Sequence, residues 1–125
     1  MSPTTLWVAL GGAIGSVARY WTDAWIARLA GTAFPWGTLT INVLGSTIIG
    51  VWFALTPATR GTMPSHLFVA VGVLGGFTTF SAFSAQTVML AQGGEWLRAA
   101  AYIGASVGLC LVGTALGFAA ATALR

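Results

Sequence analysis

Four long apolar stretches dominate the chain, and short connections rich in glycine, proline and polar residues separate them. The stretches cover about residues 6–29, 36–55, 66–91 and 96–124. A helix of about 20 apolar residues is enough to cross the hydrocarbon core of a bilayer, and each stretch reaches that length. Because the connections are short, consecutive helices should be antiparallel neighbours. The pattern predicts an all-α membrane protein, with residues 1–125 forming a single domain of four transmembrane helices.

The composition supports a membrane protein and argues against an enzyme. Hydrophobic residues make up 57% of the chain and charged residues 6%, whereas about 25% of a soluble domain is charged. Acid–base and metal chemistry need clusters of carboxylate, imidazole or thiol groups. Here these groups are few and widely separated: Asp23, His66, Glu95 and Cys110. The net charge of +3 comes from dispersed arginines without a basic run, so nucleic-acid binding is not expected either.

The arginines are divided almost evenly between the two sides of the predicted bundle. Arg60 and Arg125 lie on the side of the N-terminus, and Arg28 and Arg98 flank the connections on the other side. The Lys/Arg bias of short loops sets the orientation in which a membrane protein inserts. This near tie therefore predicts weak orientation, with both topologies present in one membrane.

Small residues recur four positions apart in the predicted helices, and four such pairs stand out. They are Gly11 and Gly15, Ser46 and Gly50, Gly104 and Gly108, and Gly113 and Gly117. Such pairs let helix backbones approach closely in lipid. Packing within one subunit explains them as well as a homodimer does. A homodimer is the simpler way to enclose a polar path, and with mixed topology its two-fold axis can lie in the membrane plane.

Two polar residues lie inside predicted helices, and the sequence allows two roles for each. Arg19 is costly in the bilayer unless it has a partner or faces water. It either pairs with Asp23 one turn away or supplies positive potential to an anion in a wet cavity. Asn42 lies in the second helix and must use its amide donors. It either forms a helix–helix hydrogen bond or lines a pathway.

The third stretch carries the most informative pattern, between Gly72 and Ser84. Its adjacent glycines followed by two threonines weaken a helix at mid-membrane depth, where free backbone groups are tolerated only inside protein or at a cavity. We expect a helix break here, which exposes carbonyl and N–H groups that bind ions. A simple glycine kink is the alternative. Two rows of side chains then repeat every three residues, one of phenyl rings and one of hydroxyls: Phe77, Phe80 and Phe83, and Thr78, Ser81 and Ser84.

These two rows of side chains have a structural interpretation and a functional one. Phenyl rows usually pack, and hydroxyls in membrane helices usually bond the carbonyl four residues back. Together they also fit a pore wall, because the edge of an aromatic ring is electropositive and faces an anion favourably. In the fourth stretch Tyr102 and Ser106 lie one turn apart. They either point at the same path or form a hydrogen bond between subunits.

Several of these motifs together resemble the bacterial CrcB/Fluc fluoride channels. The matching segments are Gly11-Gly12-Ala13-Ile14-Gly15 with Arg19-Tyr20, Pro35-Trp36-Gly37-Thr38-Leu39 with Asn42 and Gly45, and Gly75 to Ser84. The resemblance implies an antiparallel, dual-topology homodimer with two pores, surrounded by lipid in the bacterial inner membrane. It also implies passive export of fluoride from the cytoplasm, which limits fluoride toxicity.

The resemblance also implies roles for individual residues. Backbone carbonyls at Gly75 and Thr78 match those that bind a sodium ion, Na⁺, at the dimer centre in the family. The positions that match pore-lining or anion-binding residues are Arg19, Asn42, Thr79, Phe80, Ser81, Phe83, Tyr102 and Ser106. Two departures stand out: Ser81-Ala82 replaces a common Ser-Thr pair, and Gln86 lies where a glutamate can occur.

Two other functions compete with a channel. A small multidrug transporter has four helices and dual topology, but it requires a membrane-embedded glutamate, and the first helix has none. A non-transporting assembly subunit explains the glycine pairs. It does not explain why the break, Asn42 and Arg19 occur together.

Overall fold

The computed structural model describes residues 1–56 and 61–125, which form four long helical rods. The first, second and fourth rods are single helices, α1 (Pro3–Ala30), α2 (Trp36–Leu55) and α6 (Trp96–Ala123). The third rod is a succession of short pieces: α3 (Pro64–His66), the π-helix η2 (Leu67–Leu74), α4 (Gly75–Phe77) and α5 (Phe80–Gln92). The described residues contain no strand. The all-α prediction is confirmed, and each predicted helix lies within a few residues of an observed one.

Local caps explain where α1 begins and ends. Its start precedes the predicted one because Ser2 accepts a hydrogen bond from the N–H of Thr5 at 3.3 Å and Pro3 occupies the first turn, a position that tolerates proline. At the other end Gly31 adopts a positive φ of 78° and donates its N–H to the carbonyl of Ala27 at 2.9 Å. Glycine adopts this conformation without strain.

Three of the four rods have both the length and the hydropathy of a membrane span. They are Trp36–Leu55, Pro64–Gln92 and Trp96–Ala123. Helix α1 has 28 residues, about 42 Å at 1.5 Å per residue, but it carries Arg19, Asp23 and Arg28. Hydropathy and length together therefore support three of the four predicted spans, and α1 matches them in length.

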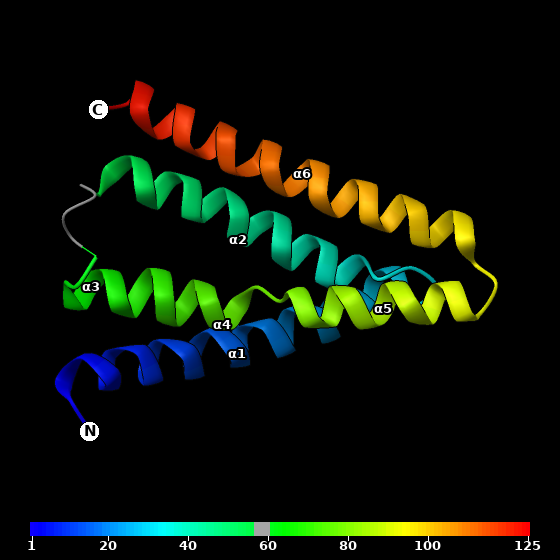
Figure 1. Ribbon diagram of the computed structural model, residues 1–125, viewed down its shortest axis with the longest axis horizontal. Helices are drawn as coiled ribbons and strands as arrows, with labels where there is room; N and C mark the ends of the chain where they lie inside the picture. The colour runs from blue at the N-terminus through cyan, green and yellow to red at the C-terminus, as the bar shows by residue number, and fades with distance from the viewer. Residues whose placement is uncertain (57–60) are drawn as a thin grey trace.

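The rods pack as two pairs. Helix α2 lies along α6, and α1 lies along η2 and α4 (Figure 1). Close backbone contacts fix both pairs, because a side chain at Gly15 would collide with Val73 and one at Gly50 with Thr114. The predicted small pairs at 11/15, 46/50 and 113/117 therefore act within the subunit. Around Gly104 and Gly108 there is open space.

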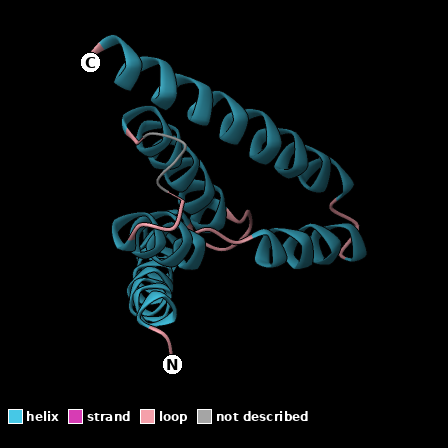
Figure 2. Cartoon of the chain, turned by 60° about the vertical axis from the view of Figure 1, so that its left-hand side comes forward, coloured by secondary structure: helices cyan, strands magenta, loops and turns pink. Residues whose placement is uncertain are grey.

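The third rod changes neighbours along its length. Its first part follows α1, whereas α5 diverges from α1 beyond the break and packs on α6 and α2 (Figure 2). The two chain ends and α3 lie at one end of the molecule (Figure 1). Arg60, which entered the count of arginines on the two sides, lies outside the described residues.

Candidate functional site: the break in the third rod

The third rod is interrupted by two extended residues. Thr78 has φ −80° and ψ 154°, and Thr79 has φ −152° and ψ 118°. The predicted break is therefore present, and a simple glycine kink is not what forms. Gly75 and Gly76 remain helical in α4, so the break lies at the two threonines that follow them.

Asn42 of α2 binds the extended backbone on both sides of one residue. Its Oδ1 accepts the N–H of Thr79 at 2.8 Å, and its Nδ2 donates to the carbonyl of Thr79 at 2.9 Å. One turn along α2, Gly45 faces the methyl group of Thr78, and a side chain at position 45 would collide with it. The structure therefore contains the hydrogen bond between elements that was one interpretation of Asn42. One N–H of the Asn42 amide remains for another acceptor.

The break leaves the last carbonyls before α5 without their helical donors, and those of Gly75 and Thr78 are among them. In an unbroken helix the N–H of Thr79 would bond the carbonyl of Gly75, but Asn42 accepts it instead. Likewise the N–H of Ala82 would bond the carbonyl of Thr78, but Thr79 Oγ1 accepts it at 3.1 Å as the N-cap of α5. The oxygens of Gly75 and Thr78 are therefore left for another partner.

A groove of about 430 Å³ runs past the break between α2, the third rod and α6. Its lining includes the polar residues Asn42, Ser46, Thr78, Thr79 and Ser106, together with Gly75. Ser106 has 7% of its surface exposed, and its hydroxyl is the one buried side-chain polar atom without a hydrogen-bond partner in the described part of the chain. A buried hydroxyl without a partner is costly, so the groove holds an unused donor.

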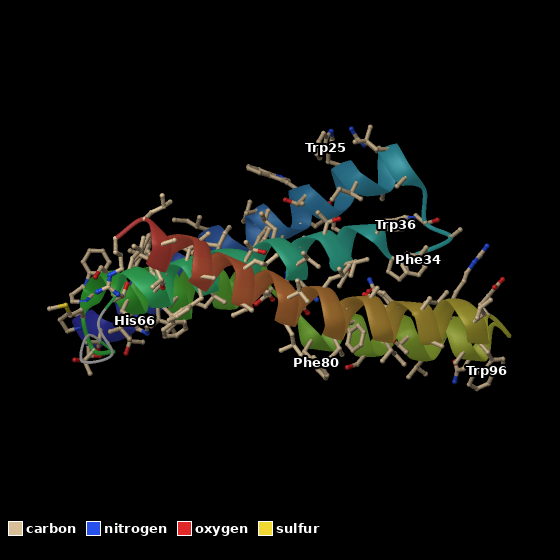
Figure 3. All side chains as sticks on the ribbon, turned by 90° about the horizontal axis from the view of Figure 1, so that it is seen from above. Trp25, Phe34, Trp36, His66, Phe80 and Trp96 are labelled. Atoms are coloured by element: carbon tan, nitrogen blue, oxygen red, sulfur yellow. The ribbon has the colours of Figure 1, made fainter. Side chains whose placement is uncertain are left out.

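The phenyl rings do not form the continuous row that the spacing predicted. Phe77 precedes the break and is buried, while Phe80 follows it with 76% of its surface exposed and points outward from α5 (Figure 3). Phe83 is buried, with its ring centroid 5.2 Å from that of Phe80 and 5.1 Å from that of Tyr102. The row is interrupted because the extended threonines reset the helical period between Phe77 and Phe80. Phe80 and Phe83 line the groove.

Most hydroxyls near the break are engaged locally. Thr78 donates to the carbonyl of Leu74 at 2.8 Å and Ser84 to that of Phe80 at 3.0 Å, the usual bonding four residues back. Ser81 and Thr79 share a hydrogen bond of 3.2 Å. The predicted hydroxyl row therefore offers fewer free donors than its spacing indicated.

Tyr102 and Ser106 have different surroundings despite their spacing of one turn. Tyr102 is completely buried and donates to Gln86 Oε1 at 2.7 Å, while Gln86 Nε2 donates to Thr38 Oγ1 at 2.9 Å. The Tyr102 bond lies within the subunit, which differs from the intersubunit bond considered above. Sequence reasoning missed Thr38, although its place four residues before Asn42 puts both on one face of α2.

Arg19 is half-buried on α1 and does not pair with Asp23. The ion pair in the described chain joins Glu95 and Arg98 at 3.6 Å. Asp23 instead lies against Gly37, where a side chain would collide with its carboxylate. This places the acidic group near the positive end of the α2 dipole.

A second pocket lies where α1 ends, α2 begins and α5 ends. Asp23, Trp36, Gln86 and Glu95 are among the residues that line it. Phe34 and Trp36 also belong to it and lie close together in Figure 3. Gln86 therefore borders this second pocket.

Comparison with known protein families assigns the chain to one family. A family model described as "CrcB-like protein, Camphor Resistance (CrcB)" matches residues 6–118. The chain belongs to the CrcB family. The matched span contains the break, Asn42, Gln86 and Ser106, so the whole candidate site lies within the CrcB region.

Curated relatives in the CrcB family match over nearly the full length of the chain. Each of three is 50% identical and is named "Fluoride-specific ion channel FluC". The protein of Rhodospirillum rubrum aligns with 98% of this chain and 97% of its own length. The corresponding shares are 94% and 94% for Paramagnetospirillum magneticum, and 96% and 93% for Opitutus terrae.

Proposed function

We propose that this chain forms a fluoride-selective passive channel that exports fluoride from the bacterial cytoplasm across the inner membrane. The observation that carries the proposal is the groove at the break, present in a chain that is 50% identical to relatives named as fluoride-specific channels. Hydrogen fluoride is neutral, crosses lipid and ionises inside the cell. A passive path for the anion then limits its accumulation.

The groove has the chemistry that a fluoride path needs. Fluoride gives up its water reluctantly, so a selective path must replace that water with donors at close range. Candidate donors in the groove lining are the unpartnered hydroxyl of Ser106, the second amide N–H of Asn42 and the hydroxyl of Thr79. Ser81 lies next to this set, where its hydroxyl shares a hydrogen bond with Thr79. The electropositive edges of Phe80 and Phe83 add to them. Tyr102 is expected among these residues from the resemblance, and its hydroxyl donates to Gln86.

A second, antiparallel copy would complete the path. In one subunit the groove is open and Phe80 is mostly exposed. A side chain added at Gly104 or Gly108 on α6 would meet no atom from the rest of the subunit within 4 Å, so this surface leaves room for a close approach of another helix. The near tie of arginines supports insertion in both orientations. The dimer has two pores, related by a two-fold axis in the membrane plane, and α1 crosses the membrane beside η2.

Sodium at the dimer centre fits the free backbone oxygens. Gly75 and Thr78 both lose their helical donors and both line the groove. Carbonyl oxygens are suitable ligands for a hard monovalent cation, and broken helices supply them in membranes. The bound ion would be coordinated by these oxygens and would hold the breaks of the two subunits together. Arg19 would contribute positive potential at the vestibule from which the anion enters.

A cation-exchanging transporter is less consistent with the site. The chain has two carboxylates, and neither Asp23 nor Glu95 lines the groove at the break. Glu95 pairs with Arg98 at the start of α6. A proton-coupled cation carrier needs an acidic group in its binding path.

Efflux from liposomes tests the proposal. Purified protein is reconstituted with internal potassium fluoride, valinomycin opens a potassium path, and a fluoride electrode records release. We expect fast fluoride release and little chloride release in a matched chloride experiment. An absence of fluoride release from folded protein supplied with sodium would contradict the proposal.

A further inference from the structure

The arginine at the end of α1 differs from the arginines at the ends of the other rods. Arg98 pairs with Glu95 at 3.6 Å, and the guanidinium of Arg125 donates to the carbonyl of Ala54 at 2.9 Å. Arg28, in the last turn of α1, is exposed, and in the described part of the chain it takes part in neither an ion pair nor a side-chain hydrogen bond. Its charge is therefore left for a partner outside the subunit.

Two tryptophans lie on the same side of α1 as this arginine. Successive residues of an α-helix are rotated by about 100°, so Trp21, Trp25 and Arg28 lie within about 60° of one another. The exposed fraction is 68% for Trp21 and 63% for Trp25, and Trp25 points away from the other rods (Figure 3). Asp23 lies about 140° from Arg28 around the helix and against Gly37 of α2. The carboxylate therefore faces a different side.

The order of residues along this side of α1 matches the depth profile of one membrane leaflet. The exposed aliphatic residues Ile14 and Val17 lie near the midpoint of the helix. Measured from that midpoint at 1.5 Å per residue, Trp25 lies at about 13 Å and Arg28 at about 17 Å. The hydrocarbon of one leaflet is about 15 Å deep. When α1 crosses the bilayer, the indole therefore lies at the hydrocarbon boundary, which tryptophan favours, and the guanidinium lies among the headgroups.

The divergence of α5 explains why this surface is uncovered. Helix α1 packs on η2 and α4 through close contacts at Gly11 and Gly15. Beyond the break α5 turns away (Figure 2), so the second half of α1 loses the neighbour that covers the first half. The five residues on this side, which we call the α1 tryptophan face, are Ile14, Val17, Trp21, Trp25 and Arg28.

Charge favours a lipid over a second copy of the chain as the occupant of the α1 tryptophan face. A second copy would have to supply an acid to Arg28, but the chain has two carboxylates. Asp23 lies against Gly37, and Glu95 pairs with Arg98. A phospholipid supplies a phosphate, which a guanidinium binds through two parallel hydrogen bonds. A zwitterionic headgroup adds a cation of its own, whereas an anionic headgroup does not.

We propose that the α1 tryptophan face binds an anionic phospholipid, with Arg28 on its phosphate and Trp21 and Trp25 beside its glycerol backbone. The lipid supplies the counter-charge and covers the half of α1 that the third rod leaves. The inference goes beyond the proposed function, because it rests on the proposed crossing of the membrane by α1 and not on which ion passes. In an antiparallel dimer each leaflet contains one such face.

Quenching of tryptophan fluorescence by brominated lipids tests the proposal. Purified protein is reconstituted in phosphatidylcholine bilayers that contain increasing fractions of brominated phosphatidylglycerol or, in a parallel series, brominated phosphatidylcholine. Wild type is compared with Arg28→Gln. Arg98→Gln is the matched control, because it removes the same charge at the same end of the molecule from a side chain that pairs with Glu95.

We expect the wild-type protein to prefer phosphatidylglycerol to phosphatidylcholine about fivefold, the contribution of one basic side chain near an anionic surface. The preference should disappear in Arg28→Gln, persist in Arg98→Gln and weaken at high salt. Replacing Trp21 and Trp25 together by phenylalanine should remove the part of the quenching that depends on the headgroup.

Three results would overturn the inference. They are equal quenching by the two lipids in the wild type, a preference that survives Arg28→Gln, and a headgroup dependence that persists without Trp21 and Trp25. Fluoride efflux from vesicles of the same composition reports separately on the proposed function. An intact lipid preference without fluoride release would overturn the proposed function and leave the lipid site standing.

Discussion

The two halves of the third rod are held in place by different means. The half before the break lies against α1 through backbone contacts, with Gly72 and Gly76 opposite Gly11 and Gly12. The half after the break, α5, is held by a few directed bonds from Asn42 and Gln86. Shape therefore positions the first half and hydrogen bonding positions the second.

This difference indicates which substitutions should abolish folding and which should alter only transport. A close-packed backbone contact has no room for a larger residue, so errors there disturb the whole subunit. A hydrogen-bonded attachment can be removed while the rest of the fold remains. The half that carries Phe80 and Phe83 of the proposed ion path is the one with fewer contacts, as is usual for parts of a protein that act on a ligand.

The largest effect, a loss of folded protein, is expected from Gly15→Val on α1. The new side chain would collide with the carbonyl of Val73 and approach the backbone of Phe77. Overpacking of this kind costs about 3 kcal/mol, and we expect little folded protein by size-exclusion chromatography and circular dichroism. Gly12→Ala is the control, because nothing lies within 4 Å of its new methyl group. Equal yields of the two variants would contradict the close packing described for α1.

A smaller loss of stability but a complete loss of transport is expected from Asn42→Leu. The change leaves the N–H and carbonyl of Thr79 without their partner, which costs about 1–3 kcal/mol for each buried group. Fluoride efflux should fall below detection, with a lower melting temperature. Thr47→Val on the same helix removes only a bond to the carbonyl of Val43 and should transport fluoride. Normal efflux in Asn42→Leu would show that ion passage does not depend on the bonds between Asn42 and the break.

An intermediate loss of fluoride efflux is expected from Gly45→Ala, and a second substitution should restore the efflux. The added methyl group would collide with the Thr78 methyl group, displacing the break at a cost of about 1–3 kcal/mol. Thr78→Ser removes that methyl group and keeps the hydroxyl that bonds Leu74. Efflux should fall in Gly45→Ala and recover in the double variant. If the second change does not restore efflux, the contact between Gly45 and Thr78 does not position the break.

The smallest effect on stability is expected from Ser106→Ala. The hydroxyl has no partner within the subunit, so its removal should leave the melting temperature unchanged or slightly raised. Fluoride efflux should nevertheless fall, because the groove loses a donor. A lower melting temperature with unchanged efflux would indicate that this hydroxyl has a structural partner instead.

The rods were predictable from the sequence, while the bonds across the break were not. Length and hydropathy located the helices, and the glycines and threonines indicated the break. Its place at Thr78 and Thr79 depends on Asn42, which lies 37 positions away from Thr79, and no local pattern encodes that pairing. The link from Thr38 to Gln86 spans 48 positions and was missed for the same reason.

Local patterns also misled where the chain leaves the helix. The spacing of Phe77, Phe80 and Phe83 assumed a continuous helical period, which the extended threonines interrupt. The ion pair of Arg19 with Asp23 assumed that neighbours on a helix bond each other, but Asp23 lies against Gly37 of α2. In both cases tertiary structure decides what the spacing leaves open.

The most direct test of the central claim is the reversal potential of currents through the purified protein in a planar bilayer, with fluoride on one side and chloride on the other. A fluoride-selective path predicts a reversal potential displaced strongly toward the equilibrium potential of fluoride. It also predicts that Asn42→Leu abolishes the current. A reversal potential near zero, or one set by chloride, would contradict the account.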